Sequence, residues 1–468
     1  MAAIIATAST AGAQGAAVAN PEPEEMAQAT PPADPAAEPP APTAGESPTA
    51  PGARETAPSS DEAMRKIAAE EAAKIKPKGP ALEFSGYTRA GVGLNVKGGK
   101  QVCFGLPGAD TKWRLGNECD YVIEPQFTGK LLTLADRSSW GVVVMPALYR
   151  SYEDPNGTDK TYFANLPIEV KQIYFYGENI PQLLYGRVWG GKRYYDRLHL
   201  NINDQFLEIH DSDGAGIEDM HVGQGKLSVA FLMNPNSEST TASVPTANLA
   251  PFELSARYTG IPTVADGELQ IWTAFIGSST SEDKADPGVT ITKPDNAFRI
   301  AAYHTLGKLL GGSNLAGAKL EYSENHLLWR AAVQQQMAFN NGRTGVDVIG
   351  ELRSAKDNDV TNNWVSLGAR ADTQISGPFR FLFETGIDRV LPEDGDDSQL
   401  IKATACLAIN ASDGPGPGPS IRLFYTHAFW NDAAQAAIAA GGSGKRLAQV
   451  YGDATNGGSF GIQAETSW

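Results

Sequence analysis

The last nine residues of the chain alternate between two kinds of side chain and end on an aromatic residue. Successive side chains of a β-strand point to opposite faces of its sheet. One face would carry mainly apolar residues and the other small or polar ones, namely Phe460, Ile462, Ala464, Thr466 and Trp468 against Gln463, Glu465 and Ser467. Because hydrocarbon offers no partner to the backbone groups of an open sheet edge, the segment predicts a strand of a closed transmembrane β-barrel.

The chain repeats this pattern from Leu82 onward. Alternating stretches of about 7 to 12 residues are separated by clusters of Gly, Asn, Asp and Pro, as in strands joined by turns. About 385 residues at roughly ten per strand, with turns and loops, give about 16 to 18 strands. No run reaches the ~18 uninterrupted apolar residues of a transmembrane helix. Any membrane passage is therefore expected to use strands.

Charged side chains take one face of these stretches. Arg89, Glu124, Arg370 and Asp372 lie opposite the apolar positions of their segments, which would place them in a watery lumen. A soluble β-sandwich alternates in the same way, but its apolar face is turned inward. Alternation alone leaves both arrangements open, and the terminal Trp468 together with the number of segments favours the barrel.

Composition narrows the possible functions. The chain has 468 residues, a net charge of −16 and a pI near 4.9, so long-range attraction to nucleic acid or anionic lipid would have the wrong sign. His199 and His210 have no neighbours at metal-ligand spacing. We therefore expect no metal, no cofactor and no catalysis.

The amino-terminal residues do not share the strand pattern. Residues 1–19 are Ala-rich and apolar and are interpreted as a signal peptide, truncated because no Lys or Arg precedes Arg54. Residues 20–58 are rich in Pro and Ala and predict a disordered tether. Residues 59–78 begin with a capping box and predict a short helix, which either joins a coiled coil or frays. The barrel is expected over 82–468.

Two of the three cysteines lie close together in a Gly-rich stretch. Cys103 and Cys119 could form a disulfide in an oxidising compartment, or remain independent thiols. Cys406 lies in an alternating segment and is interpreted as a small packing residue.

Two sequence blocks resemble the maltoporin (LamB-type) family of carbohydrate porins, which includes the sucrose porins. The first runs from Phe84 to Gly93 and continues with Lys112–Cys119, and the second runs from Gly191 through Arg197 and Asp204 to Glu218. The resemblance implies a trimer of 18-stranded antiparallel transmembrane β-barrels in the outer membrane of a Gram-negative bacterium. It further implies a pore narrowed by an inward-folded loop, a first loop closed by Cys103 and Cys119, and an amino-terminal extension in the periplasm.

The resemblance also implies how sugars pass. Ionised side chains exchange hydrogen bonds with sugar hydroxyls while aromatic rings stack on the sugar. The matching ionic positions are Arg89, Arg114, Glu124, Lys171, Arg197 and Asp204, and the aromatic candidates are Tyr87, Phe163, Phe206 and Phe252.

The aromatic series is incomplete in this chain. Val122, Ile375 and Ser467 stand where maltoporins carry aromatic residues, and the alternation around Phe252 does not show which way its ring points. Passive, sugar-selective diffusion of oligosaccharides is the preferred interpretation, and a general diffusion porin with little sugar selectivity is the alternative. A barrel enzyme such as a lipid hydrolase and a secreted binding module are less favoured.

Overall fold

The computed structural model describes residues 80–468 apart from 152–167, 234–248, 265, 281–294, 412–417 and 441–444. The signal peptide, tether and short helix predicted for 1–19, 20–58 and 59–78 lie outside the described residues, as does Phe163. They stay predictions.

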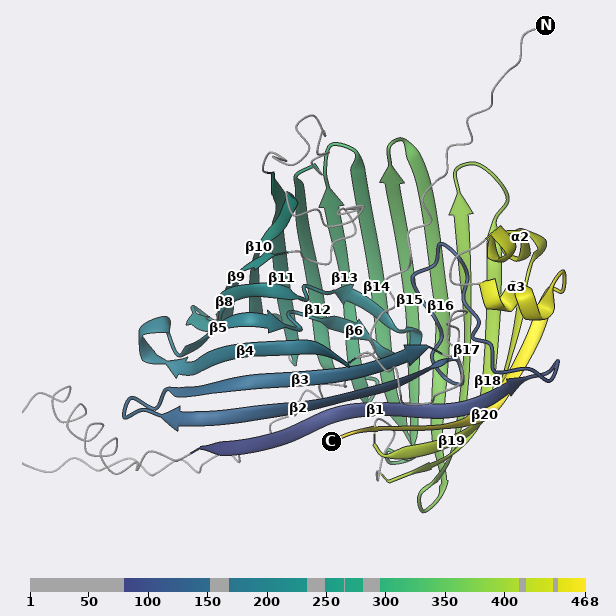
Figure 1. The fold of residues 1–468 in the computed structure, drawn as a ribbon, viewed down its shortest axis with the longest axis horizontal. Coiled ribbons are helices and arrows are strands. Elements are labelled where there is room, and N and C mark those ends of the chain that lie inside the picture. Colours follow the sequence, from purple (N-terminus) through teal and green to yellow (C-terminus); the bar gives the residue numbers. More distant parts are fainter. Residues whose placement is uncertain are drawn as a thin grey trace, which may run out of the picture.

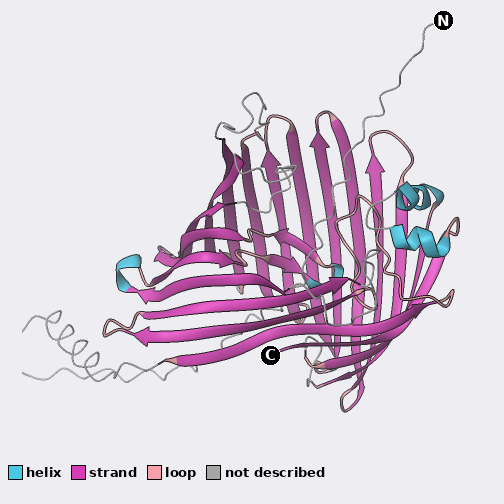
Figure 2. Cartoon of the chain, viewed as in Figure 1, coloured by secondary structure: helices cyan, strands magenta, loops and turns pink. Residues whose placement is uncertain are grey.

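Eighteen antiparallel strands form one sheet among the described residues (Figures 1 and 2). They are β1 (Ala81–Asn95), β2 (Asp120–Thr133), β3 (Ser139–Ser151), β4 (Ile168–Ile180), β5 (Gly186–Arg193), β8 (Ser212–Val222), β9 (Gly225–Met233), β10 (Leu249–Pro262), β11 (Gly267–Thr280), β12 (Ala297–Leu309), β13 (Gly312–Tyr322), β14 (His326–Phe339), β15 (Thr344–Asp357), β16 (Val360–Ser376), β17 (Phe379–Pro392), β18 (Ser398–Asn410), β19 (Ser420–Trp430) and β20 (Asn456–Ser467). The predicted 18-stranded antiparallel β-barrel is confirmed.

The first and last strands close the sheet into a barrel. β1 pairs with β2 through Gly86 and Pro125 and with β20 through Ala90 and Ala464. The backbone of Trp468 exchanges two hydrogen bonds with Gly86, each 3.0 Å long. The final residue of the chain therefore takes part in closure, and no edge is left open between these strands.

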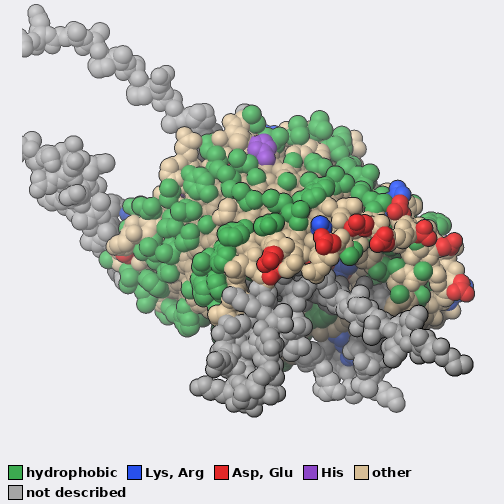
Figure 3. Space-filling view, turned by 90° about the horizontal axis from the view of Figure 1, so that it is seen from above, with side chains coloured by type: hydrophobic (Ala, Val, Ile, Leu, Met, Phe, Trp, Pro, Cys, Tyr) green, Lys and Arg blue, Asp and Glu red, His purple; other side chains and the backbone are tan. Residues whose placement is uncertain are grey.

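The outer face of the barrel is apolar. Side chains such as Phe298, Leu254 and Leu423 are exposed there, and hydrophobic side chains cover much of the outer surface seen in Figure 3. The charged residues of the same strands point inward, as Arg299 and Glu321 do. This is the reverse of a soluble sandwich, so the faces of the sheet match a lipid exterior and a polar lumen.

Two connections fold into the lumen instead of extending away from the barrel. The first is residues 96–119, between β1 and β2, which we call the first loop. The second is residues 194–211, between β5 and β8, which we call the inner segment; it contains β6 (Leu198–Leu200), the 3₁₀ helix η2 (Asn201–Asn203) and β7 (Gln205–Glu208). Both are densely packed against the inner wall, so most of the molecule's apolar core lies inside the barrel.

The few helical elements lie at the strand connections. The 3₁₀ helix η1 (Pro181–Leu183) joins β4 to β5, and α2 (Asp432–Ala440) and α3 (Lys445–Tyr451) lie between β19 and β20 (Figure 1). Ile438 and Tyr451 pack with Phe104 of the first loop in one apolar cluster. In the described part of the chain, no helix has the length and apolarity of a membrane span.

Candidate functional site

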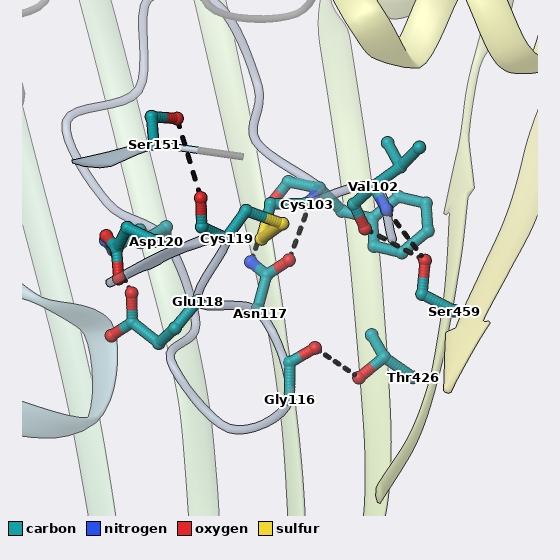
Figure 4. Close-up of a disulfide and its surroundings, with 12 residues drawn as sticks. Val102, Cys103, Gly116, Asn117, Glu118, Cys119, Asp120, Ser151, Thr426 and Ser459 are labelled. Atoms are coloured by element: carbon teal, nitrogen blue, oxygen red, sulfur yellow. Dashed lines mark hydrogen bonds and ion pairs between the residues drawn. A yellow bond between two sulfur atoms is a disulfide. The ribbon is translucent and has the colours of Figure 1, made fainter. Parts of the chain in front are cut away.

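The first loop is closed by a disulfide. Cys103 and Cys119 are bonded, with their Cα atoms 5.9 Å apart (Figure 4). Asn117 ties the same two arms together, because its Oδ1 accepts from Phe104 N at 2.7 Å and its Nδ2 donates to Phe104 O at 2.8 Å. The disulfide inferred from the family resemblance is present. Cys406 is a buried free thiol packed beneath the loop, as interpreted.

The first loop meets the inner segment in the lumen. Lys112 N donates to Asn203 O at 3.1 Å, and Arg114 N donates to Ile202 O at 3.0 Å. These two backbone hydrogen bonds join the first loop to the inner segment. The side chains that flank this junction are consequently brought from distant parts of the sequence into one place.

Eight charged side chains gather at this junction, and we call them the ionic cluster. Four are cations and four are carboxylates, so their formal charges balance. Its members are Arg89, Lys112, Arg114, Arg422, Glu118, Asp120, Asp204 and Glu465.

Glu118 pairs with three of the four cations of the ionic cluster. It lies 2.9 Å from Arg89 Nη1, 2.7 Å from Lys112 Nζ and 2.7 Å from Arg114 Nε. Asp204 binds Lys112 at 3.0 Å. Because the first loop supplies Glu118, Lys112 and Arg114, its position determines the geometry of the whole group.

Tyr87 connects the ionic cluster to the last strand. Its hydroxyl donates to Glu465 Oε1 at 2.6 Å and accepts from Arg89 Nη1 at 3.1 Å and Arg114 Nη2 at 3.3 Å. Glu465 also accepts from Arg114 at 3.0 Å and pairs with Arg422. The Tyr87 ring is 1% exposed, so this aromatic acts here as a hydroxyl donor within the ionic cluster.

Burial and charge oppose each other in the loop carboxylates. Burial acts to raise the pKa of Asp204, but Lys112, the hydrogen bond with His199 and Arg114 together hold the pKa well below its ordinary value. Burial likewise acts to raise the pKa of Glu118, and its three cations lower it overall. Both groups are therefore ionised at neutral pH.

A second group of predicted residues lies beside the ionic cluster. The Arg197 guanidinium binds Asp211 and lies 3.3 Å from the centroid of the Tyr194 ring. Tyr194 in turn donates its hydroxyl to Glu124 Oε1 at 3.0 Å. The centroid of the Phe206 ring lies 5.4 Å from Arg197 Cζ. The Arg197 guanidinium therefore lies next to two aromatic rings, those of Tyr194 and Phe206.

Only one of the two carboxylate oxygens of Glu124 has a hydrogen-bond partner among the described residues. Its Oε1 accepts from Tyr194, but its Oε2 has no hydrogen-bond partner among the described residues, although Glu124 is 1% exposed. A buried carboxylate oxygen is costly to leave unpaired. Among the described residues this oxygen is enclosed by protein and lacks the hydrogen bond that would offset its burial.

The remaining candidates lie apart from these two groups. Lys171 pairs with Glu169 of its own strand at 2.5 Å. Phe252 is a correction, because its ring stacks at 5.9 Å on Phe231, which is exposed on the outer face. The inward positions of β10 are taken by Glu253 and its alternate neighbours, so Phe252 faces outward and is not a lumen residue.

The structure also changes how the ionic residues are understood. The sequence led us to expect side chains that face the lumen and offer hydrogen bonds to sugars, whereas Arg89, Arg114 and Asp204 are buried and bind oppositely charged side chains of the protein. The reason is that the first loop and the inner segment fill the space between the walls. The positive and negative charges of the ionic cluster balance, so the junction of the two loops is polar but neutral overall. No cluster of metal-ligating side chains occurs among the described residues.

Several members of the ionic cluster were not identified from the sequence. Lys112 and Glu118 lie inside a block that carries the family resemblance, and the alternation had already assigned Glu465 to the inward face. The sequence therefore already contained the information needed to propose Lys112, Glu118 and Glu465 as lumen residues. Arg422 and Asp120 offered only an inward position in a strand, which many residues share.

A model of the LamB porin family matches residues 82–468. Among solved structures, OpdO of Pseudomonas aeruginosa is similar at 10% identity and a TM-score of 0.45, over 83% of this chain and 97% of that one. OccD3 (OpdP) of the same species has 9% identity and a TM-score of 0.44, over 84% and 93%. An anion-selective porin from Comamonas acidovorans has 9% identity and a TM-score of 0.40, over 82% and 99%.

Proposed function

Because the chain belongs to the LamB porin family, it is an outer-membrane diffusion channel, and we propose that it selects sugars among the solutes that pass. Flux through it is passive and follows the gradient. The substrates are short oligosaccharides or disaccharides, which need fewer aromatic contacts than long maltodextrins. The protein is a channel and has no turnover.

The observation that carries this proposal is the group formed by Glu124, Tyr194, Arg197 and Phe206. It combines an unpaired carboxylate oxygen with two rings that lie against a guanidinium. Carboxylates and guanidinium groups make stronger hydrogen bonds to hydroxyls than neutral groups do, and the faces of sugar rings stack on aromatic side chains. Weak contacts of this kind favour passage, since a deep binding well would retain the sugar.

The direct test is a planar-bilayer recording titrated with mono-, di- and oligosaccharides. Concentration-dependent block of the ionic current is expected for the wild type, with weaker block for Glu124→Gln. Glu83→Gln is the matched control, because Glu83 lies at the start of β1 in an exposed pair with Lys130. Equal sugar block in all three proteins would show that Glu124 takes no part in selection.

A general diffusion porin is the second candidate. Val122 is buried in the inner wall where the family carries an aromatic residue, so one stacking surface is missing. If no sugar at any concentration reduces the wild-type current, this second function replaces the first.

We further propose that the channel is a homotrimer with its amino-terminal extension in the periplasm. Porin barrels associate through their outer apolar faces, and β1 begins at the barrel end where the short turns lie. The expected results are a trimer band on an unheated detergent gel and cleavage of the extension by protease only after the outer membrane is opened. A monomer at all detergent concentrations, or cleavage in intact cells, would contradict the proposal.

A further inference from the structure

Trp113 of the first loop fills a recess in the inner wall. Its ring lies over Gly368 of β16 and Gly386 of β17, which are paired directly across the two strands. A Cβ atom on Gly386 would lie 1.9 Å from Trp113 Cε2, and one on Gly368 would lie 2.4 Å from Trp113 Cη2. Any side chain at Gly368 or Gly386 would overlap the indole, so the paired glycines leave the space that this ring occupies.

The same indole also packs with the inner segment. Trp113 is 1% exposed and shares an apolar cluster with Leu200 and Ile202. The residues on either side of it, Lys112 and Arg114, make the two backbone hydrogen bonds to the inner segment and extend their side chains into the ionic cluster. Trp113 therefore lies between the β16–β17 wall and the junction of the two loops.

The backbone that follows Trp113 is fixed to the wall as well. Leu115 O accepts hydrogen bonds from Lys402 Nζ at 2.8 Å and Thr404 Oγ1 at 2.9 Å. Gly116 O accepts from Thr426 Oγ1 at 3.0 Å. With these anchors in place, the depth of the indole in the recess determines how far the junction projects from the wall.

We propose that Trp113 is the positioning residue of the junction between the first loop and the inner segment. Its ring, seated on Gly368 and Gly386, holds the first loop and the inner segment at a fixed distance from the wall and so fixes the ionic cluster within the lumen. Eviction of the ring would move Lys112 and Arg114 with it. The inference rests on the proposed function only in that the protein conducts; it does not require sugar selectivity.

The test is Gly386→Ala, which places a methyl group in the recess and leaves every loop residue unchanged. Single-channel conductance and the reversal potential in a salt gradient are expected to differ from the wild type, because the junction and its charges move. Gly350→Ala on β15 is the matched control, since its Cβ would meet only Leu367 and Val333 at an ordinary 3.7 Å. It should conduct as the wild type does.

Two variants of Trp113 make the test specific. Trp113→Ala should change conductance and reversal potential, and Trp113→Phe, which keeps a ring in the recess, should restore most of the wild-type behaviour. In the Trp113→Ala background, Gly386→Ala should add little, because there is no longer a ring to displace. Additive effects would contradict coupling through the recess.

Folding is checked for each variant by the faster migration of the unheated barrel on a detergent gel. If Gly386→Ala does not fold, Trp113→Ala alone decides, because it adds no bulk. A folded Trp113→Ala or Gly386→Ala protein with wild-type conductance and reversal potential would overturn the proposal. Sugar block is recorded separately, so its absence in the wild type would count against sugar selectivity and not against the role of Trp113.

Discussion

Glu118→Gln tests whether the ionic cluster is a buried, low-dielectric network. Breaking a buried ion pair by removing one partner costs about 3–5 kcal/mol. Glu118 binds three cations, but each of them keeps a second carboxylate within 3.0 Å. These remaining pairs are Arg89 with Asp120, Lys112 with Asp204, and Arg114 with Glu465. The expected loss in free energy of unfolding is therefore near the lower end, about 3 kcal/mol at pH 7.

The pH dependence of this loss has a defined sign. The pKa of Glu118 is lowered in the folded protein because its three cations outweigh the opposing effect of burial. Its stabilisation is present above the unfolded pKa of about 4.3 and is lost as the pH falls through the folded value. The difference in stability between wild type and Glu118→Gln should accordingly be full at pH 7 and shrink in acid.

The assay is urea unfolding in lipid vesicles, followed by tryptophan fluorescence and by the unheated band on a gel. Glu83→Gln is the control, because its exposed pair with Lys130 should contribute little. A folded Glu118→Gln protein within about 0.5 kcal/mol of the wild type at pH 7 would refute the reasoning. That result would mean that the ionic cluster is solvated by water and does not lie in a buried, low-dielectric environment.

Three further predictions use the same unfolding assay. Cys103→Ser with Cys119→Ser should lower stability by about 3 kcal/mol, given the sequence separation of 16, and a reductant should then have no added effect. Burial acts to lower the pKa of His210, but the Glu253 carboxylate and hydrogen bonding raise it to about 9. The free energy of unfolding should therefore fall as the pH rises from about 6.5 through 9. A His210→Gln protein whose stability falls with pH in the same way would disprove this. Trp468→Ala should lower the free energy of unfolding by about 1 kcal/mol, because the ring contact with Phe84 of β1 is lost. An unchanged urea midpoint would count against a contribution from that contact.

Much of the fold could be predicted because strand alternation is a local property. The faces of β1 and β20 were assigned correctly from the period of two, down to the inward position of Glu465, which contacts Tyr87 and Arg114. Phe252 shows the limit of this reasoning. Apolar and polar residues surround it on both sides, so only the pairing of β10 with its neighbours establishes that its ring lies among outward-facing aromatics.

The sequence by itself determined the strands and the polarity of their two faces, since both are set by adjacent residues, and the terminal Trp468 with the number of segments favoured a closed barrel over a sandwich. It also contained the family blocks that identified Arg89, Arg114 and Asp204. Only the tertiary structure decided what these residues contact. Tyr87 and Glu465 are 378 positions apart, and their hydrogen bond, like the seat of Trp113 on two glycines, arises from barrel closure and from loops that fold inward.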